Sequence, residues 1–595
     1  MKFKISVLLT ALLSVGLVAC NDDNDNNQTN TPAEVVETTP ETIKLSLLGR
    51  YETNVFAKSA AEIPAYDAAS KRLFVVNAQK GLVDVLDASK PEKPVHLAEL
   101  SARTYLANSE VNSVAVKNGI VALAVQAEQK TDTGIVVFFN AKDLSFISKV
   151  SVGALPDMLT FSPDGKTVLV ANEGEPNDDY SVDPEGSVSI IDISNIKQPK
   201  ASVADFKAWN TQKADLLAKG VRIFGPNASV AQDLEPEYIT ISADSKTAWV
   251  TLQENNAIAR IDIAQQKVTD IYPLGYKDHG VMGNELDVSD KDKKIDIKTW
   301  AGLVGMYQPD SIANYQANGQ TYLVTANEGD SREWLKDSKA YYAGDTRQGF
   351  VENIRMKHLF NSKGFNTGGD YPAHLQKLAV GVKGAKLNPV TFAYCGATET
   401  GAGGCRDDAQ LGRLNIAWNM GYQTNADGSP KLDANGLLTY DKLYAYGARS
   451  FSIWNTQGQL VWDSGSEFEK KTAELFPDYF NSDHEAVAFD DRSDNKGPEP
   501  EGITVGSIGQ KTFAFIGLER MSGIMIYDIS TPNKPKFIEY FTTRNFTETE
   551  TAKQGDLGPE GLIFIAAKDS PNGKPLLVVG NEVSGSTAVY QVNVH

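Results

Sequence analysis

The segment PDMLTFSPDGKTVLVANEG, residues 156–174, contains the pattern that decides the fold. A short apolar run follows Pro156-Asp157, Pro163-Asp164-Gly165 interrupts it, and a β-branched run returns to Asn172-Glu173-Gly174. Apolar runs of this length on both sides of a Pro-Asp-Gly turn are typical of a β-hairpin. The segment therefore predicts two antiparallel strands with an acidic residue near each end.

The same order of proline, acid, strand, turn and strand recurs along the chain. Further clear copies begin at Pro236-Glu237, Pro309-Asp310, Pro500-Glu501 and Pro559-Glu560. Two degenerate copies, at 63–77 and 110–128, keep the strands but lose the proline-acid pair. Internal repetition of a strand unit is typical of propellers, so we predict an all-β fold, a seven-bladed β-propeller.

The sequence also predicts how the ring of blades closes. Each copy continues into a third and a fourth strand, but the last copy ends with its third strand at 587–592. We expect the N-terminal segment 45–51 to supply the missing fourth strand. An array of β-sandwiches is the alternative fold, although it does not require one phrase shared by all units.

The N-terminus predicts export and lipidation. Lys2 and Lys4 precede an apolar run at 5–19 that is too short to span a membrane, and Cys20 follows small residues. We predict a lipoprotein signal peptide at 1–19 and a lipidated Cys20. We expect residues 20–42, rich in Asn, Asp, Thr and Pro, to form a disordered tether before a propeller at 43–595. An ordinary signal peptide with a chance cysteine is the alternative.

These signals predict an outer-membrane lipoprotein of a bacterial cell envelope that faces the periplasm or the cell surface, with the N-terminal lipid as its only membrane attachment. The chain has 57 basic and 76 acidic residues and a formal charge of −19, which argues against nucleic acid as a partner. We expect a monomer. In an oxidising compartment Cys395 and Cys405 are expected to form a disulfide, with two free thiols as the alternative.

The repeat places acidic residues on one rim of the ring. The first strand of each blade and the second strand run in opposite directions, so the acid before one and the acid after the other lie at the same end. The residues concerned are Asp157, Glu173, Glu237, Glu254, Asp310, Glu328, Glu501, Glu519, Glu560 and Glu582.

Clustered carboxylates stay ionised together only if a cation, donors or water offsets their repulsion. Oxygen ligands without cysteines or paired histidines favour a divalent cation, Ca²⁺ before Mg²⁺, and not zinc. The alternative is that each acid accepts hydrogen bonds from loop amides of its neighbour and braces the blades.

Long insertions emerge on the same rim, at 207–235, 275–308, 331–446 and 465–498, and predict a loop and helix cap over an acidic face. The insertion at 331–446 interrupts the fifth blade. A secondary metal loop is possible at Asp287, Ser289, Asp290 and Asp292, which offer oxygens at alternating positions. A solvated run of charges explains these residues equally well.

Three arginines, Arg332, Arg449 and Arg520, follow rim motifs and either bind phosphate or pair with the ring acids. Asp483-His484-Glu485 lies in a rim loop, but no nucleophile motif accompanies it. We therefore expect a surface-exposed lipoprotein whose acidic face binds a divalent cation and an extracellular ligand or a matrix or mineral component. A metal-dependent phosphoesterase of the atypical alkaline phosphatase type is the alternative, with no catalytic residue identified.

Several longer motifs resemble one family. They are ANEG at 171–174, YLVTANEG at 322–329, GARSFS at 447–452, GPEPEG at 497–502, GLER at 517–520, GPEG at 558–561 and NGKPLLVV at 572–579. The chain is similar to the choice-of-anchor I domain family over nearly all of 43–595, and its repeat resembles WD40- and YVTN-type units. The resemblance implies a surface-tethered propeller with a variable anchor, a link to calcium and mineral surfaces, and alkaline phosphatase labels on some relatives. This chain has Lys293 where the family's Asp-rich loop has a glycine.

Overall fold

The computed structural model describes residues 38–359, 382–397 and 403–595. The predicted signal peptide and Cys20 lie outside the described residues. Within the described part, no helix combines the length and apolar character that a membrane crossing needs.

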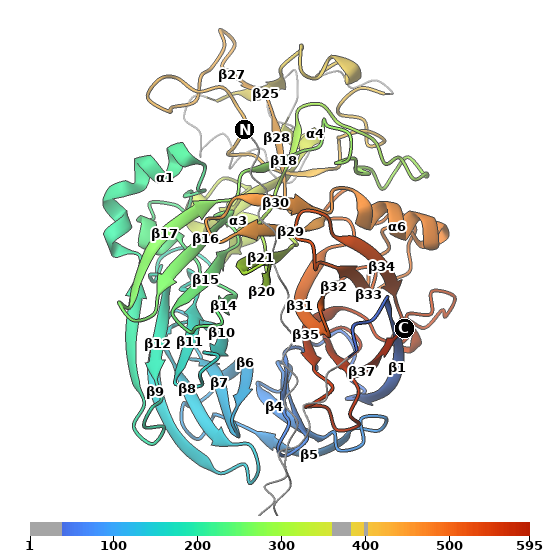
Figure 1. The fold of residues 1–595 in the computed structure, drawn as a ribbon. Helices are drawn as coiled ribbons and strands as arrows, with labels where there is room; N and C mark the ends of the chain where they lie inside the picture. The colour runs from blue at the N-terminus through green and yellow to red at the C-terminus, as the bar shows by residue number, and fades with distance from the viewer. Residues whose placement is uncertain (1–37, 360–381, 398–402) are drawn as a thin grey trace, which may run out of the picture. The chain divides into compact units, whose positions relative to one another are not determined.

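Seven four-stranded antiparallel sheets make up most of the described chain (Figure 1). Each sheet is one blade, and its strands follow one another from the inner to the outer edge. The first three blades are β2 (Pro64–Asp67), β3 (Arg72–Asn77), β4 (Leu82–Asp87) and β5 (Val95–Leu100); β6 (Glu110–Lys117), β7 (Ile120–Gln126), β8 (Thr133–Asn140) and β9 (Phe146–Ala154); and β10 (Pro156–Phe161), β11 (Thr167–Asn172), β12 (Ser187–Asp192) and β13 (Lys200–Asp205).

The remaining blades follow the same order. They are β14 (Ile239–Ile241), β15 (Thr247–Leu252), β16 (Ala257–Asp262) and β17 (Lys267–Pro273); β20 (Ile312–Ala317), β21 (Gln320–Asn327), β29 (Ser450–Asn455) and β30 (Leu460–Asp463); β31 (Pro500–Ile508), β32 (Lys511–Leu518), β33 (Gly523–Asp528) and β34 (Lys536–Phe541); and β35 (Pro559–Ile565), β36 (Leu576–Asn581), β37 (Ser586–Val594) and β1 (Ile43–Glu52).

The inner strands form a closed ring. Contacts run from β2 to β6, β10, β14, β20, β31 and β35, and from β35 back to β2. The predicted seven-bladed propeller is therefore confirmed. Such closure leaves only short outer edges for unwanted pairing.

Apolar side chains between neighbouring sheets form the core. Ala122 and Phe138 of the second blade pack with Leu159 and Val170 of the third. The middle strands are almost wholly buried, whereas the outer strand β13 is mostly exposed. This gradient explains why the second and third strands of each repeat are continuous apolar runs.

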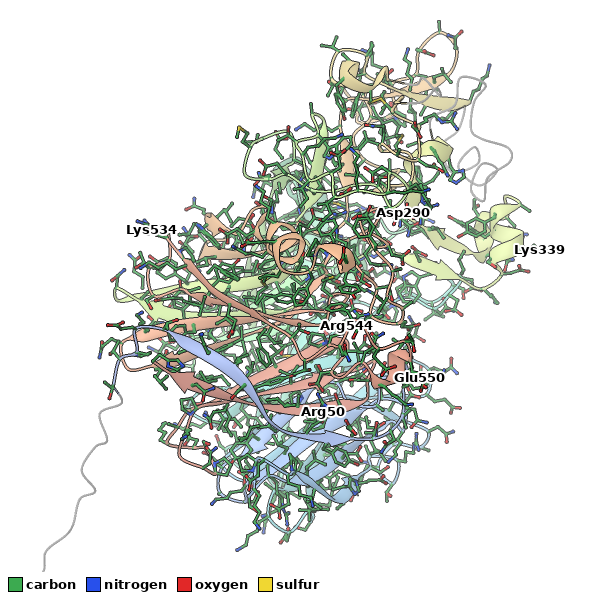
Figure 2. All side chains as sticks on the ribbon, turned by 90° about the vertical axis from the view of Figure 1, so that its right-hand side faces the viewer. Arg50, Asp290, Lys339, Lys534, Arg544 and Glu550 are labelled. Carbon is green, nitrogen blue, oxygen red and sulfur yellow. A yellow bond between two sulfur atoms is a disulfide. The ribbon has the colours of Figure 1, made fainter. Side chains whose placement is uncertain are left out.

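The two ends of the chain close the last blade together, as predicted. β1 pairs with β37 from Ile43–Val594 to Glu52–Ser586. Arg50, labelled in Figure 2, lies on β1 and also donates two hydrogen bonds of 2.7 Å to the buried carboxylate of Asp556.

The four long insertions lie where the sequence places them. The 207–235 segment contains η1 (Lys207–Gln212), α1 (Lys213–Lys219) and α2 (Val230–Asp233), the 465–498 segment contains α6 (Glu467–Leu475) and η4 (Pro477–Tyr479), and a short η5 (Thr551–Lys553) precedes the last blade. The 331–446 cap is built from short strands as well as helices: β22 (Glu333–Leu335), α3 (Ser338–Tyr342), η2 (Thr346–Gln348), β23 (Gly349–Val351), β24 (Asn353–Arg355), α4 (Met356–Leu359), β25 (Gly384–Leu387), η3 (Ala393–Cys395), β26 (Asn415–Ala417), β27 (Leu437–Tyr440) and β28 (Leu443–Ala445).

The cap shares one sheet with the 275–308 segment. Strands β18 (Tyr276–Asp278) and β19 (Leu303–Met306) continue through β28 into β26 and β24. Trp300 from that segment is buried with the cap residues Phe392 and Tyr440 in a core of their own. The structure contains a disulfide between Cys395 and Cys405 inside the cap.

Candidate functional site: an acidic ring

In three blades the acid after the proline lies in a β-bulge. Pro156 faces Asn172 and Leu159 faces Val170, so β10 has one residue more than β11 in this interval. The same irregularity follows Pro500 in β31 and Pro559 in β35. A bulge redirects the extra residue out of the regular alternation of a strand. It explains how an acid inside an apolar strand reaches the channel.

The acid after the second strand is held at the same rim by main-chain bonds. The amide of Glu173 donates to the carbonyl of Leu155 at 3.0 Å, and the amide of Glu582 donates to that of Gly558 at 2.8 Å. In the sixth blade the amide of Glu519 donates to the carbonyl of Glu499 at 2.8 Å. The two acids of a blade are therefore neighbours, as strand direction predicts.

A cavity of about 350 Å³ opens among these acids. Six carboxylic side chains line it: Glu62, Asp157, Glu173, Glu175, Asp310 and Glu560. Burial and the charge of Glu175 raise the pKa of Asp157 to about 7. Burial and nearby acids also raise the pKa values of Glu173, Asp310 and Glu560 well above the usual range. Burial and mutual repulsion therefore favour the protonated form of these carboxyl groups, and a cation bound in the cavity would favour their ionised form.

Six of the ten predicted ring acids have no partner. Among the described residues, no hydrogen bond or ion pair is formed by the side chains of Asp157, Glu173, Glu237, Asp310, Glu501 and Glu560. A brace between blades needs donors on these oxygens, and none is present in the described part. The bracing alternative therefore does not account for these six.

The first blade contributes an acid that the sequence analysis missed. The amide of Glu62 donates to the carbonyl of Val76, whose own amide donates to the carbonyl of Ile63. Glu237, Thr251 and Tyr238 repeat this arrangement in the fourth blade. Burial and the charge of Glu582 raise the pKa of Glu62 to about 8. Glu62 does not fit the proline-acid pattern, because Ala61 and not a proline precedes it. An acid at the same distance before the first strand of a blade is the sequence signal that identifies it.

The second blade replaces the acids by amides. Asn112 is the extra residue of the bulge, since Val111 faces Val125 and Ser113 faces Ala124. Its Nδ2 donates to Oε1 of Gln126 at 2.9 Å, and both side chains line the cavity. The ring is therefore acidic in six blades and neutral in one.

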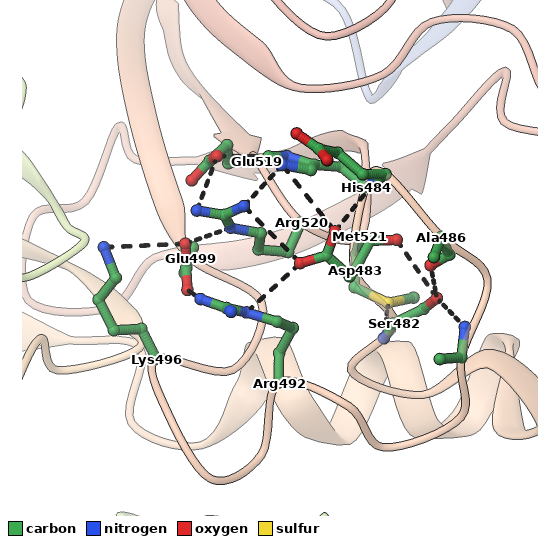
Figure 3. Close-up of polar contacts among 12 residues, drawn as sticks. Ser482, Asp483, His484, Ala486, Arg492, Lys496, Glu499, Glu519, Arg520 and Met521 are labelled. Carbon is green, nitrogen blue, oxygen red and sulfur yellow. Dashed lines mark hydrogen bonds and ion pairs between the residues drawn. The ribbon is translucent and has the colours of Figure 1, made fainter. Parts of the chain in front are cut away.

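Internal cations pair with several other acids of the rim (Figure 3). Lys496 pairs with Glu328, and Arg492 and Arg520 both pair with Glu499. Burial opposes protonation of Lys496, but the charges of Glu328 and Glu499 raise its pKa well above the usual value. Lys496 comes from the 465–498 insertion, so a loop outside the repeat neutralises this part of the ring.

His484 belongs to the same network. Its Nδ1 lies 3.2 Å from Oε1 of Glu519, and its Nε2 lies 2.6 Å from Nη1 of Arg520 (Figure 3). Burial and the charge of Arg520 lower the pKa of His484 to about 4. The imidazole is therefore neutral at pH 7, with Nε2 accepting from Arg520.

Three sets of ring side chains have ligand atoms within 4.8 Å of one another: Asp310 with Glu328 and Glu501, Glu328 with Glu499 and Glu519, and His484 with Glu519 and Glu582. Lys496 and Arg520 occupy the second and third sets. In the first set, Oε2 of Glu501 is buried without a hydrogen-bond partner among the described residues. This set best fits a hard cation, because it combines three carboxylates with an unsatisfied acceptor.

A fourth set, Asp84, His96 and Glu99, lies on outer strands of the first blade, away from the ring. Lys80 already contacts it, at 2.7 Å from Glu99 and 3.8 Å from Asp84.

The three arginines from the sequence analysis all pair with acids. Arg332 is buried between Asp233 and Glu235, and Arg520 pairs with the ring acid Glu519 at 3.2 Å. Arg449 pairs with Glu469 on α6 and not with a ring acid. None of the three presents an unpaired guanidinium to the channel.

The Asp-rich loop directs its oxygens to its own surroundings. Asp287 accepts from the amides of Ser289 and Asp296, and Ser289 donates to the carbonyl of Asp408. Asp290 pairs with Lys291 and Arg413, and Asp292 lies 3.8 Å from Lys294. Amides and basic side chains thus contact the oxygens that were considered for a metal.

Fold and site together define a β-propeller with acidic side chains around its channel and a cap inserted in its fifth blade. The family model of the Choice-of-anchor I domain matches residues 62–532, and the chain belongs to this family.

Two curated relatives are similar in sequence. Gigasin-3a of Magallana gigas is 30% identical over 198 residues, which is 31% of this chain and 66% of that protein. The mesenchyme-specific cell surface glycoprotein of Strongylocentrotus purpuratus is 25% identical over 390 residues, 61% of this chain and 44% of that protein. The matches thus span less than two thirds of each relative.

Solved structures are also similar. Kuenenia stuttgartiensis hydrazine synthase is 12% identical with a TM-score of 0.42 and covers 91% of this chain and 99% of its own. The β-propeller domain of Myceliophteria thermophila Cps50 (Swd1) is 8% identical with a TM-score of 0.39 and covers 91% and 100%.

Proposed function

We propose that this protein is a lipid-anchored binding protein whose acidic ring takes up a divalent cation, Ca²⁺ before Mg²⁺, and through it an extracellular ligand or a matrix or mineral component. The observation that carries the proposal is the set formed by Asp310, Glu328 and Glu501, whose ligand atoms lie within 4.8 Å of one another.

The chemistry of this set favours calcium. Ca²⁺ takes about six to eight oxygen ligands in a flexible geometry, whereas Mg²⁺ demands a near-ideal octahedron. Three carboxylates together offer up to about six oxygen ligands, the lower end of this range, without any nitrogen or sulfur. Glu328 also accepts from Gln253 at 2.9 Å and pairs with Lys496, which leaves Asp310 and Glu501 as the side chains without a partner cation.

The location forms part of the same proposal. The basic start, the apolar run and Cys20 support a lipid anchor in a bacterial envelope. The relative from Strongylocentrotus purpuratus is, by its name, a cell surface glycoprotein. Palmitate labelling that is lost in Cys20→Ser, with export retained, is the expected result; labelling that persists in the variant contradicts the anchor.

The phosphoesterase alternative receives less support. A phosphate site needs an available cationic donor, and Arg332, Arg449 and Arg520 are all engaged by acids. We therefore place the binding function first.

Calcium titration of the purified protein tests the proposal. We expect Ca²⁺ to raise the melting temperature, because a ligand bound only by the folded state stabilises it. Glu501→Gln replaces one carboxylate oxygen by an amide nitrogen and removes the negative charge, so it should weaken Ca²⁺ binding about tenfold or more. Asp164→Asn, in an exposed turn of the third blade, is the matched control and should bind normally. A melting temperature that ignores both Ca²⁺ and chelator would contradict the proposal, and Ca²⁺-dependent hydrolysis of p-nitrophenyl phosphate would favour the enzyme.

A further inference from the structure

The cavity beside the proposed metal site is too wide for one ion. It measures about 350 Å³, whereas a metal is held by ligand atoms that converge on one point. Among the described residues, no three of the six acids that line it bring ligand atoms within 4.8 Å of one another. Its carboxylates are distributed around a space, as the binding site of an extended, multiply charged molecule would be.

The acids of this wall have few cations near them. Among the described residues no lysine or arginine lines the cavity, and Lys496 and Arg520 form ion pairs with Glu328, Glu499 and Glu519, which do not line it. The charge of Lys496 lowers the pKa of the cavity residue Asp310, but burial and nearby acids outweigh it. Of the six acids, only Glu175 forms an ion pair within the described part of the chain, with Lys130 at 2.9 Å. The remaining acids lack a cationic partner.

A further ring acid has an unsatisfied oxygen. Glu254 is 7% exposed, and its Oε2 has no hydrogen-bond partner among the described residues. Its charge raises the pKa values of Glu237 and of the cavity residue Glu173, whereas burial raises its own pKa and the charges of Arg332 and Arg222 oppose this rise. A buried acceptor without a donor is costly, and a ligand that donates there would remove the cost.

The rest of the wall selects the kind of cation. Apolar side chains, Ile63, Val111 and Met158, line the cavity together with the carboxylates and the amides of Asn112 and Gln126. A chain of methylene groups with ammonium groups at intervals matches this mixed wall, since it buries its stem and donates at its charged ends. The protein itself shows such a contact, because the ammonium group of Lys496 lies between Glu328 and Glu499 in the same ring.

We propose that this cavity binds primary ammonium groups on flexible methylene chains. Free polyamines and the lysine side chains of a partner protein share this chemistry. The inference rests on the proposed function in assigning cations to the acidic ring, but it names the extracellular ligand and places it beside the metal.

Calorimetric titration with spermidine and with a hexalysine peptide tests the inference, and the same peptide with acetylated side chains tests the need for the ammonium group. We expect spermidine or hexalysine to bind and the acetylated peptide to fail. Glu173→Gln should weaken binding about tenfold, because one charge-assisted contact is lost. Asp164→Asn is the charge-matched control from the same blade and should behave as the unmodified protein. Melting curves establish that each variant is folded.

The outcomes separate this inference from the proposed function. Tighter binding of spermidine identifies a free polyamine as the ligand, and tighter binding of hexalysine identifies a partner protein. Glu501→Gln should lose Ca²⁺ and keep the amine, whereas Glu173→Gln should lose the amine and keep Ca²⁺. Absence of amine binding with intact Ca²⁺ binding overturns the inference alone. Equal weakening by Asp164→Asn and Glu173→Gln also overturns it, because the attraction would then be a general effect of net charge.

Discussion

At the scale of single residues, the ring depends on how each carboxylate is compensated. Glu328 and Glu499 have Lys496, and Glu519 has Arg520. Glu62 has only the hydroxyl of Ser59 among its favourable contacts, and the charge of Glu582 opposes its ionisation. Residues of the same type in equivalent positions therefore differ in protonation because of what other segments bring to them.

Glu62 leads to a prediction on pH. Its pKa is raised from 4.5 to about 8, so the folded protein retains a proton that the unfolded chain releases above pH 4.5. The contribution of Glu62 to stability is fully present below about pH 4.5 and is lost as the pH rises to about 8. Glu62→Gln should remove this loss, at most about 5 kcal/mol by pH 8, so its stability relative to the unmodified protein should increase across that window.

Urea unfolding at pH 4.5, 6 and 8 measures the difference, with exposed Asp164→Asn as the control. A difference between Glu62→Gln and the unmodified protein that does not change with pH would contradict an elevated pKa.

At the scale of elements, a bulge and a glycine position the acids. Gly502 follows Glu501, and a Cβ at this position would lie 2.0 Å from the carbonyl oxygen of Glu560 in the next blade. The inner strands of these two blades therefore approach so closely that only hydrogen fits between them. The same contact holds the bulges with Glu501 and Glu560 beside each other.

Gly502→Ala should force the two strands apart. We expect a loss of about 1–3 kcal/mol in the free energy of unfolding, as for overpacked cores, together with weaker Ca²⁺ binding because Glu501 moves. Chemical denaturation and calcium titration measure both effects. Ser507→Ala, an exposed position on the same strand, should change neither. Unchanged stability in Gly502→Ala would show that the strands can separate without cost.

At the scale of the whole molecule, the ring holds because its first and last strands pair. β1 covers the outer edge of β37 and buries Ile43 and Leu45 against the last two blades. Without β1, β37 would have an unpaired edge and Asp556 would lose the cation of Arg50.

A chain that begins at Thr53 should therefore melt at a clearly lower temperature and aggregate more readily than one that begins at Thr38. Burial of two large apolar side chains and a partly buried ion pair is worth several kcal/mol. Differential scanning calorimetry compares the two chains, and a peptide of residues 38–52 added in trans should restore part of the difference. Equal melting temperatures would mean that the other blades hold the ring closed without β1.

The amino-acid sequence alone determined the repeat, the number of blades, the closing strand and the rim on which ten acids lie. These follow from short-range patterns, since the run after Pro156 and the turn at Pro163 specify a hairpin locally, and strand direction then fixes the rim. The tertiary structure decided which acids are compensated. Lys496 reaches Glu328 from 168 residues away, and Glu62 joins Glu582 only through ring closure. Contacts between distant segments depend on the packing of loops that no local pattern encodes, so the division of the ring into a neutralised side and an open, acidic cavity could be read only from the fold.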